Sequence, residues 1–95
     1  GDEVIVEKGC SKCGEIKPKG INVAMFIAKH KCFRDKDIEV RVVDSKNKEW
    51  KLIEFVDSGE RLKFECLDCH RRLNIHLAIT DKQLIHALEV SHAGN

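Results

Sequence analysis

Residues 9–32 read GCSKCGEIKPKGINVAMFIAKHKC and carry the strongest structural signal in the chain. This stretch opens with the pair Cys10 and Cys13, and sixteen residues separate Cys13 from His30, which Cys32 follows closely. Two cysteines at CxxC spacing form a turn that offers two thiolates to one ion, and zinc takes four such ligands in a tetrahedron. The stretch therefore predicts a metal site, with zinc as the expected ion.

The same spacing occurs a second time in the chain. Cys66 and Cys69 stand 56 positions after the first pair, and sixteen residues again separate the second cysteine from a histidine, His86. A further potential ligand, His92, ends this half as Cys32 ends the first. We therefore predict two zinc ions per chain and two sets of four ligands: Cys10, Cys13, His30 and Cys32, then Cys66, Cys69, His86 and His92.

Two other arrangements remain open on the residues alone. Both CxxC pairs can instead converge on one four-cysteine site, as in zinc ribbons, with a single zinc ion per chain. Alternatively, His70 or His76 replaces His86 in the second set. His86 falls on the same helix side as Lys82 and Glu89, away from the apolar residues, and this conflicts with its place in the repeat.

Length and composition favour a metal-supported fold. A chain of 95 residues with 42% hydrophobic and 35% charged residues makes one domain, or two very small ones, with a limited core. Structural zinc supplies roughly 10–16 kcal/mol of apparent binding free energy in small peptides, and this becomes folding free energy. Five cysteines cannot all pair in disulfides, so we expect a reducing intracellular compartment, the cytoplasm or nucleus, and no membrane association.

The first third predicts a strand and a helix. Residues 4–6 form a short apolar strand candidate that runs into the first CxxC pair, and residues 15–19 return from it as a second arm. Asn22 is a suitable N-cap for a helix over residues 23–31. His30 falls on the apolar face of that helix, where a metal ligand has to lie.

The middle third predicts a β-hairpin. Apolar residues alternate over residues 38–42, a polar turn follows at 44–48, and a second β-prone run covers residues 50–55 before Gly59 closes the hairpin. The hairpin carries no predicted metal ligand, so it serves as a spacer or a platform.

The last third predicts two strands and a capped helix. Residues 61–65 and 73–79 alternate as strands do, and Thr80 with Gln83 forms a capping box for a helix over residues 81–91. We therefore expect an α+β fold in which two small zinc-bound hairpin-plus-helix modules, residues 1–36 and 61–95, flank the central hairpin at 37–60 in one compact domain.

This organisation resembles the broad zinc-finger class, through the ligand sets Cys10/Cys13 with His30/Cys32 and Cys66/Cys69 with His86/His92. The resemblance covers most of the chain outside residues 33–60. The common two-cysteine, two-histidine finger has about twelve residues between its ligand pairs, where both halves here have sixteen. The base-reading helix positions of that finger are therefore not carried over to this chain.

Catalytic motifs are absent from the sequence. The chain has no H-x-E of the zinc deaminases, no H-E-x-x-H and no phosphate-binding glycine loop. Four protein ligands at a zinc ion also leave no open position for a substrate. We therefore expect a non-enzymatic binding module without a small-molecule substrate.

Two kinds of partner are compatible with the residues, nucleic acid and another protein. A basic patch of the N-terminal half, extended by two arginines after the second CxxC pair, is the candidate nucleic-acid surface: Lys12, Lys17, Lys19, Lys29, Lys31, Arg34, Lys36, Arg71 and Arg72. Scattered lysines of this kind are more often a solvated face. The alternative is a protein interface at the hairpin, with an edge strand or Trp50 as an apolar anchor.

Overall fold

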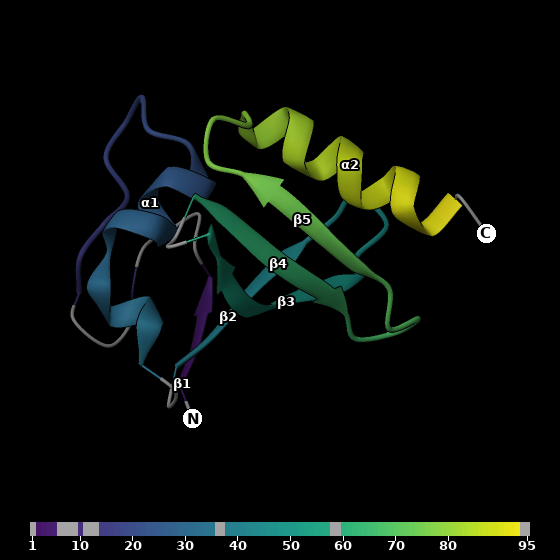
Figure 1. Ribbon diagram of the computed structural model, residues 1–95, viewed down its shortest axis with the longest axis horizontal. Coiled ribbons are helices and arrows are strands. Elements are labelled where there is room, and N and C mark those ends of the chain that lie inside the picture. The colour runs from purple at the N-terminus through teal and green to yellow at the C-terminus, as the bar shows by residue number, and fades with distance from the viewer. Residues whose placement is uncertain (1, 6–9, 11–13, 36–37, 58–59, 94–95) are drawn as a thin grey trace.

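The computed structural model describes residues 2–5, 10, 14–35, 38–57 and 60–93 and has five strands and two α-helices in that part of the chain (Figure 1). In chain order the elements are β1 (Asp2–Ile5), α1 (Val23–Lys29), the 3-10 helix η1 (Lys31–Arg34), β2 (Ile38–Val43), β3 (Glu49–Val56), β4 (Arg61–Cys66), β5 (Arg72–His76) and α2 (Asp81–Ala93).

The strands form one sheet in the order β1-β2-β3-β4-β5. Strands β2 to β5 are antiparallel neighbours, and β1 pairs in parallel with β2 at the edge. The predicted α+β class is confirmed. The predicted pair of hairpin-plus-helix modules is not what the sheet shows, because strands from all three thirds of the chain pair in one sheet, and residues 14–22 before α1 contain no strand.

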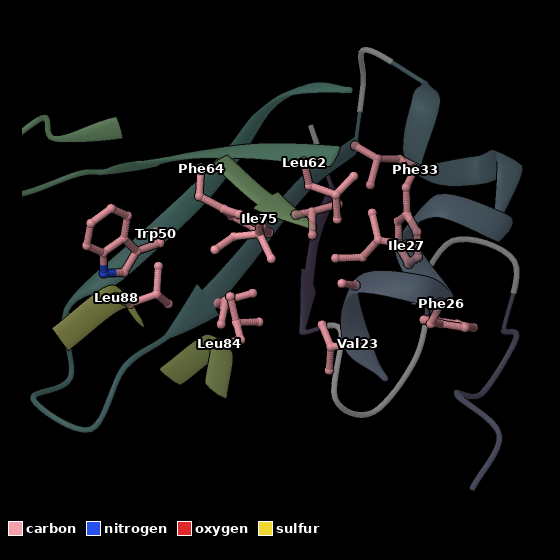
Figure 2. Close-up of a cluster of buried hydrophobic side chains, with 14 of the residues drawn as sticks. Val23, Phe26, Ile27, Phe33, Trp50, Leu62, Phe64, Ile75, Leu84 and Leu88 are labelled. Carbon is pink, nitrogen blue, oxygen red and sulfur yellow. The ribbon is translucent and has the colours of Figure 1, made fainter. Parts of the chain in front are cut away.

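Both helices cover the same face of the sheet. Figure 2 shows side chains from α1, α2 and strands β3 to β5 meeting in one row, in which Trp50, Phe64 and Leu88 lie at one end and Ile27 at the other. These four side chains are completely or almost completely buried. Each buried side chain of this size stabilises the fold by about 1.5–3 kcal/mol, so the sheet has one continuous core instead of two small ones.

The hairpin predicted in the middle third is confirmed, and its turn is anchored from inside. Asp44 is buried, and its carboxylate accepts hydrogen bonds from the Trp50 indole (3.1 Å) and from the backbone N–H groups of Lys46 (2.9 Å) and Lys48 (3.0 Å). Trp50 is 0% exposed, so its proposed use as a surface anchor is wrong. Strands β2 and β3 both have neighbours on two sides, so neither is an edge strand.

The capping box of α2 is confirmed. The Gln83 N–H donates to Thr80 Oγ1 (3.1 Å), and the Thr80 N–H donates to Gln83 Oε1 (3.0 Å). Leu84 and Leu88 are buried and His86 is exposed, as the helical spacing predicts.

Helix α1 begins where expected, but its cap comes from a distant residue. Asn22 makes no side-chain hydrogen bond at the cap position, and the Val23 N–H instead donates to Asp81 Oδ1 at 2.7 Å. The side chain of the first residue of α2 therefore caps the N-terminus of α1. The helix ends at Lys29, earlier than predicted, because His30 takes an extended conformation before η1 begins.

The face of the sheet opposite the helices carries acidic and basic side chains that pair with one another. Glu39 lies within ion-pair distance of Arg41 (2.9 Å) and Lys51 (3.5 Å), and the Arg72 guanidinium donates to Glu65 at 2.8 Å. That guanidinium, by its hydrogen bond, holds the pKa of the Glu65 carboxyl below its ordinary value. No helix of the described residues is long and apolar enough to cross a membrane.

We expect Asp44→Ala to lower the free energy of unfolding by about 2–4 kcal/mol, because it leaves a buried indole N–H and two backbone N–H groups without their acceptor. Urea unfolding followed by Trp50 fluorescence measures the change. The matched control is Asp57→Asn at an exposed carboxylate, which should change the free energy by less than about 0.5 kcal/mol. Equal losses in the two variants would contradict the anchoring role of Asp44.

The Arg72–Glu65 pair predicts a pH dependence of stability. A carboxyl whose folded pKa is depressed stabilises the fold above its unfolded pKa, and this contribution disappears as the pH falls through the folded pKa. The unfolding free energy of the parent protein should therefore exceed that of Arg72→Gln at pH 6, and the two should converge below about pH 4. A difference that persists unchanged at pH 3 would show that Arg72 acts by packing and not by charge.

Candidate metal centre

Three predicted ligands come together at one end of the sheet. One ligand atom from each of Cys10, His30 and Cys32 lies within 4.8 Å of the other two. Cys10 and His30 are buried and Cys32 is partly buried. Among the residues that the structure describes, this is the group of three or more His, Cys, Asp or Glu side chains with the geometry to hold a metal ion.

Local backbone hydrogen bonds position Cys10. The Cys10 N–H donates to the Glu15 carbonyl (2.8 Å), and the Gly14 N–H donates back to the Cys10 carbonyl (2.9 Å). Gly14 has φ +76°, a left-handed conformation that glycine adopts without steric cost. The turn therefore closes tightly behind the cysteine, and we call a CxxC turn with these two bonds a knuckle.

The hydrophobic core positions His30. Its ring centroid lies 5.2 Å from that of Phe26 and 4.6 Å from that of Phe33. The Cys32 N–H donates to His30 Nδ1 at 3.3 Å, so Nδ1 is on the Cys32 side of the ring. His30 Nε2 lies 3.1 Å from the Glu15 carboxylate.

Glu15 is a residue of this centre that the sequence pattern did not reveal. A metal-bound histidine commonly donates its other ring N–H to a carboxylate, which fixes the tautomer and the ring orientation. The Glu15 carboxylate lies where it can accept a hydrogen bond from a proton on His30 Nε2, and such a bond would orient the ring. A carboxylate two positions after a CxxC pair is the only signal in the sequence, and many such residues are simply exposed.

The fourth predicted ligand of this set, Cys13, lies outside the described residues and stays a prediction. Two thiolates and one imidazole are ligands that zinc accepts at a structural site. The donor set of Cys10, His30 and Cys32 therefore fits zinc, and the spacing of Cys13 fits the remaining position.

The second CxxC pair repeats the knuckle in its backbone. The Cys66 N–H donates to the Arg71 carbonyl (2.9 Å), and the His70 N–H donates to the Cys66 carbonyl (2.9 Å). His70 stands where Gly14 stands in the first knuckle and takes a similar φ of +63°. The Asp68 N–H also donates to Cys66 Sγ at 3.4 Å.

The two knuckles do not meet. The first belongs with α1 and η1, and the second follows β4 at the opposite end of the long axis of the molecule (Figure 1). The alternative of one four-cysteine site is therefore not supported by this arrangement. Cys66 is buried and Cys69 exposed.

The second ligand set stays a prediction. His86 is exposed on α2, and His92 lies in α2 with its side chain outside the described residues. The two histidines weighed as replacements, His70 and His76, are both exposed. His76 Nδ1 accepts a hydrogen bond from the Ala78 N–H (3.1 Å), and His70 Nδ1 lies 3.8 Å from Glu65.

The structure separates the predicted basic residues into two groups. Lys17, Lys19, Lys29 and Arg34 lie on the loop, helix and 3-10 helix around the Cys10–His30–Cys32 group. Arg71 and Arg72 follow the second knuckle at the other end of the sheet (Figure 1). Lys12, Lys36 and the side chain of Lys31 are outside the described part of the chain.

No protein-family model, no curated protein sequence and no solved structure matches this chain. The resemblance to zinc fingers therefore rests on the ligand spacing and on the Cys10–His30–Cys32 group, and function has to be argued from the geometry.

We expect Cys32→Ser to remove about one zinc ion per chain, because it deletes a thiolate from the Cys10–His30–Cys32 group. Native mass spectrometry counts the ions directly. Cys69→Ser is the matched control, since its thiol lies at the other knuckle and its loss should leave the first ion bound. If the purified parent chain carries no zinc, or if Cys32→Ser retains every ion, the proposed centre is not a zinc site.

Proposed function

We propose that the protein is a non-catalytic nucleic-acid-binding module, stabilised by structural zinc and contacting phosphates through basic side chains around the first metal centre. The fuller form of the proposal has two zinc ions per chain, the first on Cys10, Cys13, His30 and Cys32. The second would lie on the 66–69 knuckle with His92 and His86 as the predicted partners.

The observation that carries the proposal is the difference between two groups of cations. On the sheet, Arg41, Lys51, Arg61, Lys63 and Arg72 each have a carboxylate oxygen within 4 Å. Around the metal centre, the side chains of Lys17, Lys19, Lys29 and Arg34 make no ion pair with any residue that the structure describes. Unneutralised cations are the ones that attract a phosphate backbone.

The metal centre gives these cations a fixed arrangement. Lys29 is the last residue of α1 and immediately precedes His30, and Arg34 ends η1 two positions after Cys32. Lys17 donates through Nζ to the Ile21 carbonyl at 2.7 Å, which holds its chain against the loop. An ion bound by Cys10, His30 and Cys32 therefore joins the three elements that carry the basic side chains. Phosphate contacts of this kind position a protein on nucleic acid without reading its sequence.

The proposed alternative, a protein interface at the hairpin, receives less support. Trp50 is completely buried, and both hairpin strands are interior strands of the sheet. The charged face that the hairpin does expose has its cations paired with carboxylates.

We expect the double substitution Lys19→Gln and Lys29→Gln to weaken binding to oligonucleotides of any sequence. The slope of log K against log salt should fall by about 1.4 for a single strand and about 1.8 for a duplex, because two phosphate contacts are lost. Fluorescence anisotropy titrations from 50 to 300 mM salt measure both quantities.

Lys63→Gln is the matched control, because its ammonium lies 3.4 Å from Glu54 on the open sheet face. It should leave affinity and slope unchanged. If the parent protein shows no salt-dependent binding to a single strand or to a duplex, the proposal is refuted. That result would not bear on whether the Cys10–His30–Cys32 group binds zinc.

A further inference from the structure

A slit opens between β2 and β3 beside η1. The two strands pair only at Arg41–Lys51, Val42–Trp50 and Val43–Glu49. Beyond these pairs β2 remains paired with β1 and β3 with β4, and the β3–β4 register shifts between Leu52 and Glu54. We call the resulting space the β2–β3 slit; its volume is about 330 Å³, at the lower end of the range for small-molecule sites.

The walls of the slit combine apolar side chains with strand edges. Its lining comes from η1 and the residue after it, from β2 and from β3, namely residues 33–35, 38–40 and 51–55. Residues 38–40 and 52–55 face each other without ladder pairs between the two strands in the described register. Backbone N–H and C=O groups on such edges bind the polar edge of a ligand. The slit narrows to the Arg41–Lys51 pair, so it fits a flat ring better than an inserted strand.

One side of the slit already contains a stacked pair. The Arg34 guanidinium lies 4.8 Å from the centroid of the Phe55 ring. Phe55 is partly buried, and Arg34 is exposed, so the guanidinium has a second face directed away from the ring. Nucleobases stack on aromatic rings and on guanidinium planes.

The charges of the slit favour a neutral ring over a phosphate. Carboxylates of Asp35, Glu39 and Glu54 line the slit together with Arg34 and Lys51. Glu39 is paired with Lys51, and Glu54 with Lys63 outside the slit. A neutral base has no net charge for these paired side chains to repel, whereas the negative charge of a phosphate would be repelled by the carboxylates.

We propose that the β2–β3 slit binds a planar heteroaromatic ring of the nucleobase type. The face of the ring stacks on the outer face of the Arg34 guanidinium, whose other face lies over Phe55, and its polar edge meets the backbone of residues 39–40 and 52–55. The source of the ring is either a free nucleoside or a base of a single strand whose phosphates lie on the basic side chains. The second source rests on the proposed function; the first does not.

The first arm of the test uses free adenosine and cytidine, which carry no phosphate, with the zinc-loaded full chain. Amide chemical shifts of residues 52–55 should move, and Arg34→Gln should weaken the binding about tenfold through loss of stacking. Phe55→Leu keeps apolar volume while removing the aromatic face and should have a similar effect. Lys82→Gln, at an exposed position on α2, should leave it unchanged.

The second arm compares a single strand with an abasic strand of the same length, which has the same phosphates. Tighter binding of the base-containing strand, with the difference abolished by Arg34→Gln, supports the slit as the base site. Equal binding of both strands together with no nucleoside-induced shift overturns the slit and leaves the proposed function standing. Nucleoside binding without any strand binding supports the slit and overturns the proposed function. A loss in Arg34→Gln that is equal for both strands makes Arg34 a phosphate contact and overturns its stacking role.

Discussion

The arrangement of the N-terminal third depends on where His30 lies. Its ring is buried against those of Phe26 and Phe33, and its Nδ1 side turns toward Cys32 while Nε2 lies beside Glu15. The same side chain is thus part of the apolar core and of the ligand group. An ion bound at this point would tie Cys10, the end of helix α1 and η1 together beside a core that is already continuous, so metal binding would add to core packing.

Paired and unpaired basic side chains lie in different parts of the molecule, which the overall composition does not show. The chain has 17 basic and 16 acidic residues, which suggests no preference for an anionic partner. The basic side chains on the open sheet face are paired with carboxylates, whereas Lys17, Lys19, Lys29 and Arg34 near the candidate metal centre have no ion-pair partner among the described residues. Basic side chains without an ion-pair partner thus lie near α1 and η1 although the net charge is close to zero, and the proposed phosphate contacts are placed there.

The irregular point of the sheet lies next to this basic region. β2 leaves β3 after three pairs, and Arg34 from η1 reaches Phe55 in the gap that results. Regular β2–β3 pairing would have closed the slit, and Ile53, where the register of the neighbouring β3–β4 ladder shifts, lines it. Register irregularities often adjoin functional sites because they redirect side chains that the ladder would otherwise fix. The proposed ring site and the proposed phosphate contacts thus share Arg34.

The local features of the fold could be predicted from the amino-acid sequence. The hairpin, the Thr80–Gln83 capping box, the inward His30 and the outward His86 follow from periods and caps that act within a few residues, and the structure agrees with each. The repeat at an offset of 56 also corresponds to a real likeness, because both CxxC turns have the same two backbone hydrogen bonds.

How these local elements combine could not be predicted without the three-dimensional contacts. The single sheet, the burial of Trp50, the cap that Asp81 gives to α1 and the separation of Arg71 and Arg72 from the other cations all depend on contacts between residues far apart in the chain. Periodicity shows which face of a strand is apolar. One continuous sheet and two separate modules would give the strands the same apolar periodicity, so the pattern does not distinguish them. The choice was made by burial, since joining the strands covers more apolar surface than two small modules can.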